Sequence, residues 1–268
     1  MKKLQLGRKV LPLYSMLALV YLLIPIVYTI AFSFNNSKGR TNTTWQGFTF
    51  AKWGDVCSQA GICEAFGNSL FIGAVSTVVA TILGTAIAIA LVRYRFKFRS
   101  LVSLSLFLPM ATPEVVMGAG LAALFFNMGT EQGFVTIIIS HVMFCLSFVV
   151  VTVKARVQTL DPVLEEAGRD LYANPAQVFW RITFPLLLPG IVSAALLSFA
   201  LSFDDFIITY FNAGPVTTFP LLIYVAASKG VPAETNVIAS GVFLLAIFLV
   251  IGTQIAANAR AKRHAKFH

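Results

Sequence analysis

Long apolar segments alternate with short polar ones along this chain. Six apolar segments contain about 20 residues or more, the length that crosses the hydrocarbon core of a bilayer as an α-helix. They span approximately residues 11–34, 66–92, 101–127, 133–154, 184–210 and 236–258. Backbone groups in lipid must pair within the protein, and these segments are too uniformly apolar for the alternating strands of a barrel. The pattern therefore predicts an all-α, polytopic membrane protein with six transmembrane helices.

The positions of the basic residues predict the orientation of these helices. Sixteen of the 20 Lys and Arg residues lie in the N-terminal segment, the second and fourth connections and the C-terminal segment, four in each. Connections rich in Lys and Arg stay in the cytoplasm, so both termini are expected there. This divides the chain into an N-terminus (1–10), a membrane domain (11–258) with a cytoplasmic loop (155–183), and a basic tail (259–268).

The composition agrees with a membrane protein and changes the interpretation of the positive net charge. Hydrophobic residues make up 57% of the 268 residues and charged residues 12%, and the mean hydropathy is +0.81. A soluble domain contains about 25% charged residues. The net charge of +9 would suit nucleic-acid binding, but the orientation of the helices explains most of it. We therefore expect lipid, and no nucleic acid, around the chain. The first apolar segment is too long for a signal peptide and lacks a cleavage site, so we expect a retained helix.

A polar stretch, EEAGRDLYANP (165–175), interrupts the apolar pattern on the cytoplasmic side. Asp161 is suited to cap a helix, and Pro162 to occupy its first position. Asn174-Pro175 is expected to end this helix after about three turns. Its apolar residues, at spacings of three and four, are Val163, Leu164, Ala167 and Leu171. The residues alone leave two possibilities open: a helix that lies on lipid headgroups or on its own bundle, and one that docks into a partner protein.

The sequence around this stretch, VKARVQTLDPVLEEAGRDLYANPAQVFWRITFPLLLPGI (153–191), resembles the EAA loop of ABC importer permeases. Glu166 and Ala167 match the motif, and ITFPLLLPG (182–190) matches its close. Gly168 replaces the usual second Ala, and Tyr172 replaces the usual Gly. A Gly there adopts a positive φ freely, whereas Tyr does not. Two explanations remain: the local turn differs, or Tyr172 packs against a partner.

The resemblance implies a type I ABC importer permease in the bacterial inner membrane. The loop helix would couple it to a cytoplasmic ATPase dimer, which would use ATP and Mg. The coupling residues would be Glu165, Glu166, Ala167, Gly168, Asp170, Leu171 and Tyr172. The chain itself has no P-loop, no Cys/His metal cluster and no catalytic constellation, and His141 stands alone in the fourth span. We therefore expect no enzymatic activity, no metal and no cofactor in this chain.

Three acids lie within the predicted spans, where an ionised carboxylate costs about 2.5–3.5 kcal/mol on insertion scales. Glu114 lies in LPMATPEVVMG (108–118), where Pro109 and Pro113 are expected to break or kink the helix. Asp204 and Asp205 lie in SFDDFIITY (202–210). Neighbouring helical positions point about 100° apart, so at most one of the two aspartates is expected to face a pathway directly. The alternatives are a protonated Glu114 bonded to a neighbouring helix, and an aspartate that anchors a helix end.

Aromatic residues accompany the two aspartates: Phe203, Phe206, Tyr210 and Phe211. Rings beside carboxylates suit an organic ammonium ion, although such clusters are also common in helix packing. The segments 108–118 and 202–240 resemble the spermidine/putrescine branch of ABC permeases. This implies a polyamine pathway formed by Asp204, Asp205, Glu114, Phe203, Phe206 and Tyr210. The other substrates in the branch, 2-aminoethylphosphonate, thiamine and ferric ion, remain alternatives.

The external side of the chain contains the two closely spaced cysteines. Cys57 and Cys63 lie in the loop 35–65, in a compartment that permits a disulfide; two free thiols are the alternative. The resemblance implies an external substrate-binding protein that docks on loops 35–65 and 211–235, and a second, homologous and non-identical permease subunit; the residues themselves leave a homodimer open. A competing interpretation is a secondary transporter that uses the three acids as ion sites, and a membrane enzyme is a third.

Overall fold

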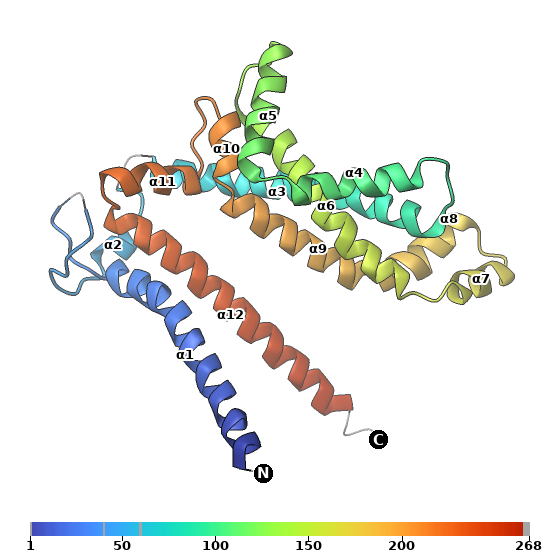
Figure 1. Cartoon of the computed structure of the whole chain (residues 1–268), viewed down its shortest axis with the longest axis horizontal. Coiled ribbons are helices and arrows are strands. Elements are labelled where there is room, and N and C mark those ends of the chain that lie inside the picture. Colours follow the sequence, from blue (N-terminus) through green and yellow to red (C-terminus); the bar gives the residue numbers. More distant parts are fainter. Residues whose placement is uncertain (1, 40, 59–60, 265–268) are drawn as a thin grey trace. The chain divides into compact units, whose positions relative to one another are not determined.

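The computed structural model describes residues 2–39, 41–58 and 61–264, and they are almost entirely helical (Figure 1). Within these residues the extended structure is limited to an isolated bridge between Asn35 and Phe48. The chain forms two compact units, Met1–Cys63 with Val225–His268 (unit 1) and Glu64–Tyr224 (unit 2). The prediction of an all-α protein is confirmed.

Unit 1 pairs the first and last helices of the chain. The helix α1 (Lys2–Ser33) packs against α12 (Ala233–His264), and the short α2 (Ala51–Gly54) also contacts α12. The loop after α1 is organised by two asparagines. The Asn35 side chain donates hydrogen bonds to Asn42 Oδ1 (2.6 Å) and to the carbonyl of Thr44 (2.7 Å), and its own oxygen accepts the amide of Gln46 (2.7 Å). This external loop is therefore ordered by its own polar groups.

Unit 2 is built on α3 (Ile62–Arg93), α6 (Phe134–Gln158) and α9 (Phe184–Asp204). Two shorter helices, α4 (Arg99–Ala111) and α5 (Glu114–Asn127), connect α3 to α6. The loop 155–183 contains α7 (Val163–Asp170) and α8 (Pro175–Val178), and a π-helical turn η1 (Phe179–Thr183) continues into α9. After α9 come α10 (Ile207–Asn212) and α11 (Phe219–Lys229), which crosses the division between the units. The apolar core includes Ala80, Leu91, Val149, Val153, Leu187 and Ala194.

Four described helical segments are long and apolar enough to cross a membrane: Val10–Ser33, Ile62–Arg93, Phe134–Gln158 and Pro175–Asp204. The pair α4 and α5 makes a fifth if it is counted as one span. The described apolar part of α12, Ala233–Phe248, is shorter. The prediction of six spans is thus met for four or five, and the side chains of residues 249–250 and 253–258 in the sixth lie outside the described part. Met1 and residues 265–268 of the predicted termini also lie outside it.

Two predicted spans are not continuous helices: the break in the first was expected from its prolines, and the second corrects the sequence analysis. The segment 101–127 is divided into α4 and α5, bent by 110°, at the prolines that predicted a break. The segment 184–210 begins earlier, at Pro175, and α9 ends at Asp204. The pair Asp204 and Asp205 therefore lies at a helix end and not along a helix. The loop helix is also shorter than expected: α7 ends at Asp170, and Asn174-Pro175 begins α8.

Candidate functional site

The break between α4 and α5 places Glu114 at a helix start. Pro113 has no amide hydrogen and fixes its own φ, so α4 stops before it. At the end of α4, the amide and the hydroxyl of Thr112 donate to the carbonyl of Leu108, at 2.9 and 2.6 Å. Glu114 is then the first residue of α5. A carboxylate is favoured there because free amides give a helix start partial positive charge.

The break between α9 and α10 is closed by the Asp205 side chain. Asp205 has extended backbone angles, φ −67° and ψ 125°. Its Oδ1 accepts the amide of Ile208 (3.2 Å), and its Oδ2 accepts the amide (2.9 Å) and the hydroxyl (3.1 Å) of Thr209. Asp205 therefore caps α10, satisfying amides that have no helical partner.

His141 of α6 lies directly beside this cap. Its Nε2 is 3.2 Å from Asp205 Oδ2 and 3.0 Å from Thr209 Oγ1, and its Nδ1 is 2.7 Å from Ser202 Oγ. The His141 side chain is 1% exposed and that of Asp205 is 3% exposed. The sequence treated His141 as isolated, because its partners lie more than 60 residues away in the chain.

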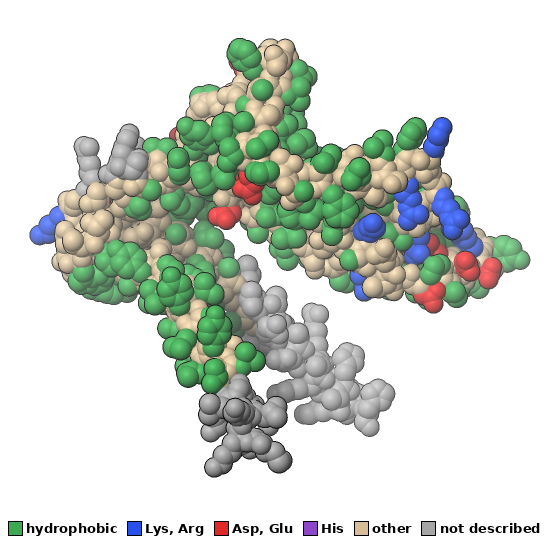
Figure 2. All heavy atoms as spheres, in the orientation of Figure 1, with side chains coloured by type: hydrophobic (Ala, Val, Ile, Leu, Met, Phe, Trp, Pro, Cys, Tyr) green, Lys and Arg blue, Asp and Glu red, His purple; other side chains and the backbone are tan. Residues whose placement is uncertain are grey.

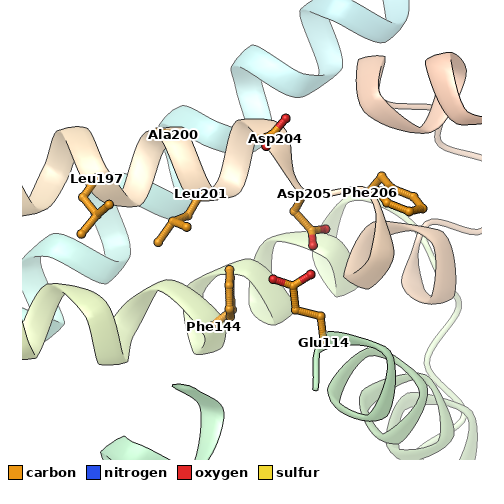
Figure 3. A pocket seen from close by; sticks show the side chains of 8 residues that line it. All are labelled: Glu114, Phe144, Leu197, Ala200, Leu201, Asp204, Asp205 and Phe206. Carbon is orange, nitrogen blue, oxygen red and sulfur yellow. The ribbon is translucent and has the colours of Figure 1, made fainter. Parts of the chain in front are cut away.

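A cavity of about 360 Å³ lies beside the two breaks. It is lined by Glu114, Phe144, Leu197, Ala200, Leu201, Asp204, Asp205 and Phe206 (Figure 3). The carboxylates of Glu114 and Asp205 point toward each other, while Asp204 projects from the other side of the α9 end. Glu114 and Asp204 make no hydrogen bond or ion pair with any described residue, unlike Asp205. The structure thus brings together the three acids that the sequence selected, and separates them into two free groups and one engaged group.

The aromatic residues that the sequence assigned to the pathway also fall into two groups, one beside the cavity and one outside it. Phe206 lines the cavity and stacks on Tyr224, with ring centroids 4.8 Å apart. Tyr210 lies edge-on to Tyr224 at 6.2 Å. Phe203 is absent from the cavity lining and packs against the rings of Phe66 and Phe199, at 5.9 and 5.8 Å. Sequence analysis missed Tyr224, whose proximity depends on how the chain turns back after α10.

Close packing holds α5 against α10. A Cβ added to Gly118 would lie 3.0 Å from the Phe211 ring and 3.2 Å from the Cα of Ile208. The side-chain amide of Asn212 donates to the carbonyls of Gly118 (3.2 Å) and Ile208 (2.9 Å). The helices that follow the two breaks are therefore fixed to each other.

The loop 155–183, which contains α7 and α8, forms a second candidate site in unit 2. Asp161 Oδ1 accepts the amide of Val163 (3.0 Å), which agrees with the predicted cap. Glu165 does not face outward: its Oε1 lies 3.1 Å from Arg93 and accepts a hydrogen bond from Thr183 at 3.2 Å. Gly168 is buried, and an added Cβ would lie 2.6 Å from the Ile182 side chain. Glu165 and Gly168 therefore attach α7 to its own protein.

The rest of α7 and the residues after it face outward. Glu166, Ala167 and Asp170 are exposed, as are the apolar side chains of Val163, Leu164 and Leu171. These apolar residues do not cover the bundle of unit 2. Both possibilities for this apolar surface, lipid headgroups and a docked partner, therefore stay open.

The conformation of Tyr172 explains how a Tyr can occupy the position where the EAA motif usually has Gly. Its φ is +60°, and it is the one non-glycine residue with positive φ in the described part of the chain. The amide of Tyr172 donates to the carbonyl of Arg169 (2.9 Å), and that of Ala173 to the carbonyl of Gly168 (3.2 Å). This is a Schellman turn, which normally takes Gly at the left-handed position. The turn typical of Gly is kept with a Tyr, whose side chain is 99% exposed.

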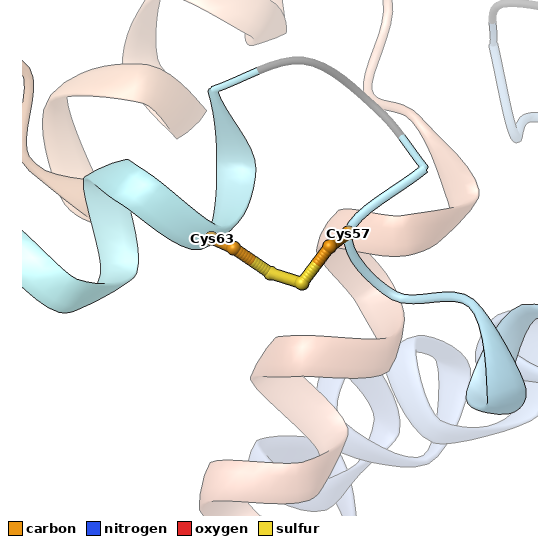
Figure 4. Close-up of a disulfide and its surroundings, with 2 residues drawn as sticks. All are labelled: Cys57 and Cys63. Carbon is orange, nitrogen blue, oxygen red and sulfur yellow. A yellow bond between two sulfur atoms is a disulfide. The ribbon is translucent and has the colours of Figure 1, made fainter.

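The loop after α1 in unit 1 is followed by a disulfide. Cys57 and Cys63 are bonded, with their Cα atoms 5.4 Å apart (Figure 4). Nearby, Lys52 and Glu234 form an ion pair at 2.6 Å. Burial acts to raise the pKa of Glu234, but the hydrogen bond and charge of Lys52 outweigh it and hold that pKa below its ordinary value. The third cysteine, Cys145, is free and buried in α6.

Comparison with known proteins assigns this architecture. Residues 76–263 match the family described as binding-protein-dependent transport system inner membrane component. The chain belongs to this family. It is therefore a multi-pass permease of the bacterial inner membrane, and such a permease is not itself an enzyme.

Curated relatives and solved structures agree with this membership. The permease protein PotC of the spermidine/putrescine transport system of Escherichia coli K12 is 37% identical over 90% of this chain and 91% of PotC. The putrescine permease PotI of the same strain is 36% identical over 84% of this chain and 82% of PotI. A bacterial ABC transporter that imports alginate has a chain of similar fold, with TM-score 0.66 and 18% identity over 94% of this chain and 95% of that one. The methionine ABC transporter MetNI gives TM-score 0.60 at 19% identity, over 72% of this chain and 94% of that one.

Proposed function

We propose that this chain forms one half of an alternating-access pathway that imports polyamines. The observation that carries this proposal is the 37% identity to a spermidine/putrescine permease over 90% of the chain. The local chemistry of the cavity supports the same substrate class.

Two free carboxylates and an aromatic ring at one cavity suit a flexible organic polycation. Glu114 and Asp204 supply negative charge that no described residue neutralises, and Phe206 supplies a ring face. Ammonium groups pair with carboxylates and are attracted to ring faces. An anionic substrate would meet repulsion at this cavity. Asp205, Tyr210 and Tyr224 complete the surroundings, and Phe203 takes the role of a packing residue.

The proposed topology has six spans with both termini in the cytoplasm, the third formed by α4 and α5 together and the fifth by Pro175–Asp204. Lys and Arg side chains gather at the end of unit 2 that carries α7 and α8 (Figure 2). By the positive-inside rule this end lies in the cytoplasm. The basic tail (259–268) and the N-terminus (1–10) join it on that side.

Coupling to a cytoplasmic ATPase dimer is assigned to the outward surface of α7 and its turn. The residues that would contact the ATPase are Glu166, Ala167, Asp170, Leu171 and Tyr172. Glu165 and Gly168 instead attach the helix to the permease, so that a force on α7 reaches α3 through Arg93 and η1 through Ile182. ATP and Mg would be used by the ATPase alone, and this chain would need no cofactor or metal of its own.

The remaining partners follow from the same proposal. The pathway needs two halves. Because the relatives PotC and PotI are themselves permease proteins of transport systems, the second half is proposed to be a homologous, non-identical permease. A binding protein would deliver substrate to the external loops 35–65 and 211–235. One solved relative, the alginate transporter, is in complex with a periplasmic protein.

Uptake in cells tests this function. Cells that express the chain with the genes for its partner ATPase, permease and binding protein receive labelled spermidine, with putrescine and 2-aminoethylphosphonate as competitors. We expect uptake that putrescine competes and that a hydrolysis-deficient ATPase abolishes. Uptake of another competitor in its labelled form, with no entry of spermidine, would overturn the substrate class. Uptake with the inactive ATPase would favour a secondary transporter.

A charge reversal tests the coupling surface. Glu166→Lys replaces an exposed acid of α7, and Glu131→Lys makes the same change at an exposed site in the loop between α5 and α6. We expect Glu166→Lys to weaken ATPase binding and uptake, and Glu131→Lys to retain both. Normal uptake with Glu166→Lys would count against the coupling role of α7.

A further inference from the structure

We propose that His141 and Asp205 are a positioning pair. They hold the break between α9 and α10 so that Asp204 and Phe206 meet the substrate, and Asp205 itself does not bind it. The inference rests on the proposed cation pathway for its substrate, but the geometry that carries it belongs to this chain alone.

The first step is that the Asp205 carboxylate has little capacity left for a ligand. A carboxylate has about four lone-pair sites. Three donors converge on Oδ2, the amide and hydroxyl of Thr209 and Nε2 of His141, and the amide of Ile208 donates to Oδ1. The side chain is also only 3% exposed, which limits access to the lone pair that Oδ1 has left. A substrate ammonium at Oδ2 would have to displace one of its three donors.

The second step is that His141 joins the two sides of the break. Through Nδ1 it contacts Ser202, in the last turn of α9, and through Nε2 it contacts Thr209, in α10. A proton on Nε2 lets His141 donate to Asp205 and lets the Ser202 hydroxyl donate to Nδ1, so each polar atom has a partner. One side chain of α6 thus fixes the end of α9 and the start of α10.

The third step is that the proposed ligand groups lie between these anchors. Asp204 and Phe206 flank Asp205 in the chain, and both line the cavity. Neither makes a hydrogen bond or ion pair through its side chain with a described residue. The position of Asp204 therefore depends on the backbone between Ser202 and Thr209, which His141 and Asp205 hold, and that of Phe206 depends on the same backbone and on its stacking against Tyr224. A displacement of about 1 Å can weaken a site by a large factor.

The test measures uptake kinetics for labelled putrescine in cells that express the complete transport system. His141→Phe keeps a ring and removes both nitrogens, whereas His141→Gln keeps a donor. We expect His141→Phe and Asp205→Asn each to raise KM about tenfold, the effect seen when groups that orient ligands lose their hydrogen bonds. His141→Gln should restore most of the affinity, and the amount of permease in the membrane should be unchanged.

Combinations with Asp204→Asn separate positioning from direct binding. If the pair acts through Asp204, then Asp205→Asn adds little to the KM of the Asp204→Asn variant. If Asp205 binds the ammonium directly, the two effects multiply, and the proposal is overturned. An unchanged KM in both His141→Phe and Asp205→Asn also overturns it.

Amide exchange of the purified permease gives a readout independent of substrate. Peptides that contain Ile208 and Thr209 should exchange faster in His141→Phe and Asp205→Asn than in the wild type. If His141→Phe fails to accumulate, Ser202→Ala and Thr209→Val can replace it, because each removes a single hydroxyl group from the same cluster. Both should raise KM and the amide exchange rate, to a smaller extent. No change in either measurement would refute the positioning role of the pair. A wild-type permease without putrescine uptake would refute the proposed function, while faster exchange would still support the held break.

Discussion

Two interruptions of helical structure in unit 2 are built in opposite ways. At the break between α9 and α10, the freed amides are bound by Asp205, which is itself held by His141, and the whole group is buried. At the turn after α7, the backbone closes its own Schellman hydrogen bonds, and Tyr172 is left almost fully exposed at φ +60°. The first is stabilised by side chains and the second by backbone geometry alone.

The difference follows from the solvent on each side. Within the membrane no water pairs with a free amide, so a break requires donors and acceptors from the protein itself. In a water-exposed loop the same groups can be solvated, and backbone strain is tolerated if the side chain it presents has a use. We infer that the buried break keeps a fixed geometry, whereas the exposed turn displays a residue for a partner.

The largest expected effect is on the buried break. Asp205→Ala removes the acceptor for two amides and for His141, and breaking a buried pair in this way costs about 3–5 kcal/mol. Unfolding of the purified permease can be followed with a thiol-reactive dye, because Cys145 is buried and the other two cysteines form a disulfide. Asp204→Ala, one residue away and exposed, is the control and should leave the melting temperature unchanged. Equal losses in both variants would remove the distinction between the two aspartates.

A smaller loss is expected where α5 meets α10. Gly118→Leu forces a side chain against Phe211 and the backbone of Ile208, and overpacking of this kind costs about 1–3 kcal/mol. Gly120→Leu lies two residues away on the same helix, where an added Cβ meets nothing within 4 Å. The same dye assay should show a lower melting temperature for Gly118→Leu alone. If both variants melt alike, α5 and α10 are not packed as described.

The exposed turn should respond in the opposite direction. Tyr172→Gly relieves a left-handed conformation that costs a non-glycine residue about 1–2 kcal/mol, and the greater chain entropy of Gly offsets about 0.5–1 kcal/mol of this. The variant should therefore be slightly more stable than the wild type. If Tyr172 contacts the ATPase, the Tyr172→Gly permease should also bind the ATPase more weakly, as measured by co-purification. Tyr172→Ala is the control: it loses the same side chain and keeps the strain. Unchanged ATPase binding in both would leave Tyr172 without a coupling role.

The smallest effect is expected at the ion pair that attaches α7. Glu165→Gln removes the charge that faces Arg93, and partly exposed pairs contribute about 0.2–1 kcal/mol. The melting temperature should fall only slightly, and the fall should diminish in high salt because screening weakens the wild-type pair. Glu166→Gln, whose side chain faces water, is the matched control and should show no salt-dependent difference. A loss as large as that of Asp205→Ala would mean that the loop is as rigid as the buried break.

Some of the site was readable from local sequence. The prolines around Glu114 predicted the break between α4 and α5, because proline acts on its own helix. The match of Glu166 and Ala167 to the EAA motif located the loop helix, and Asp161 correctly marked its start. The identity of the helix end was less accessible: Asn174-Pro175 is as well suited to begin a helix as to end one, and the structure uses it as the cap of α8.

Other parts of the site depended on contacts between distant residues. His141 is unremarkable in its own segment, and its role comes from Ser202, Asp205 and Thr209 on other helices. The resemblance assigned Glu165 to the coupling residues, but in the structure its carboxylate pairs with Arg93 of α3. Phe203 was grouped with Phe206 by sequence proximity, although the end of α9 separates them.

The sequence by itself determined the class of protein, its helical character, the three acids and the position of the loop helix in the chain. These follow from apolar length, basic residues and local motifs, which act through the solvent and the neighbouring backbone. Only the tertiary structure decided that Glu114 and Asp204 are free while Asp205 is held by hydrogen bonds, because the donors come from α6 and α10. It also decided that Tyr172 keeps a turn made for glycine, since hydrogen bonds across the whole turn outweigh the preference of a single residue.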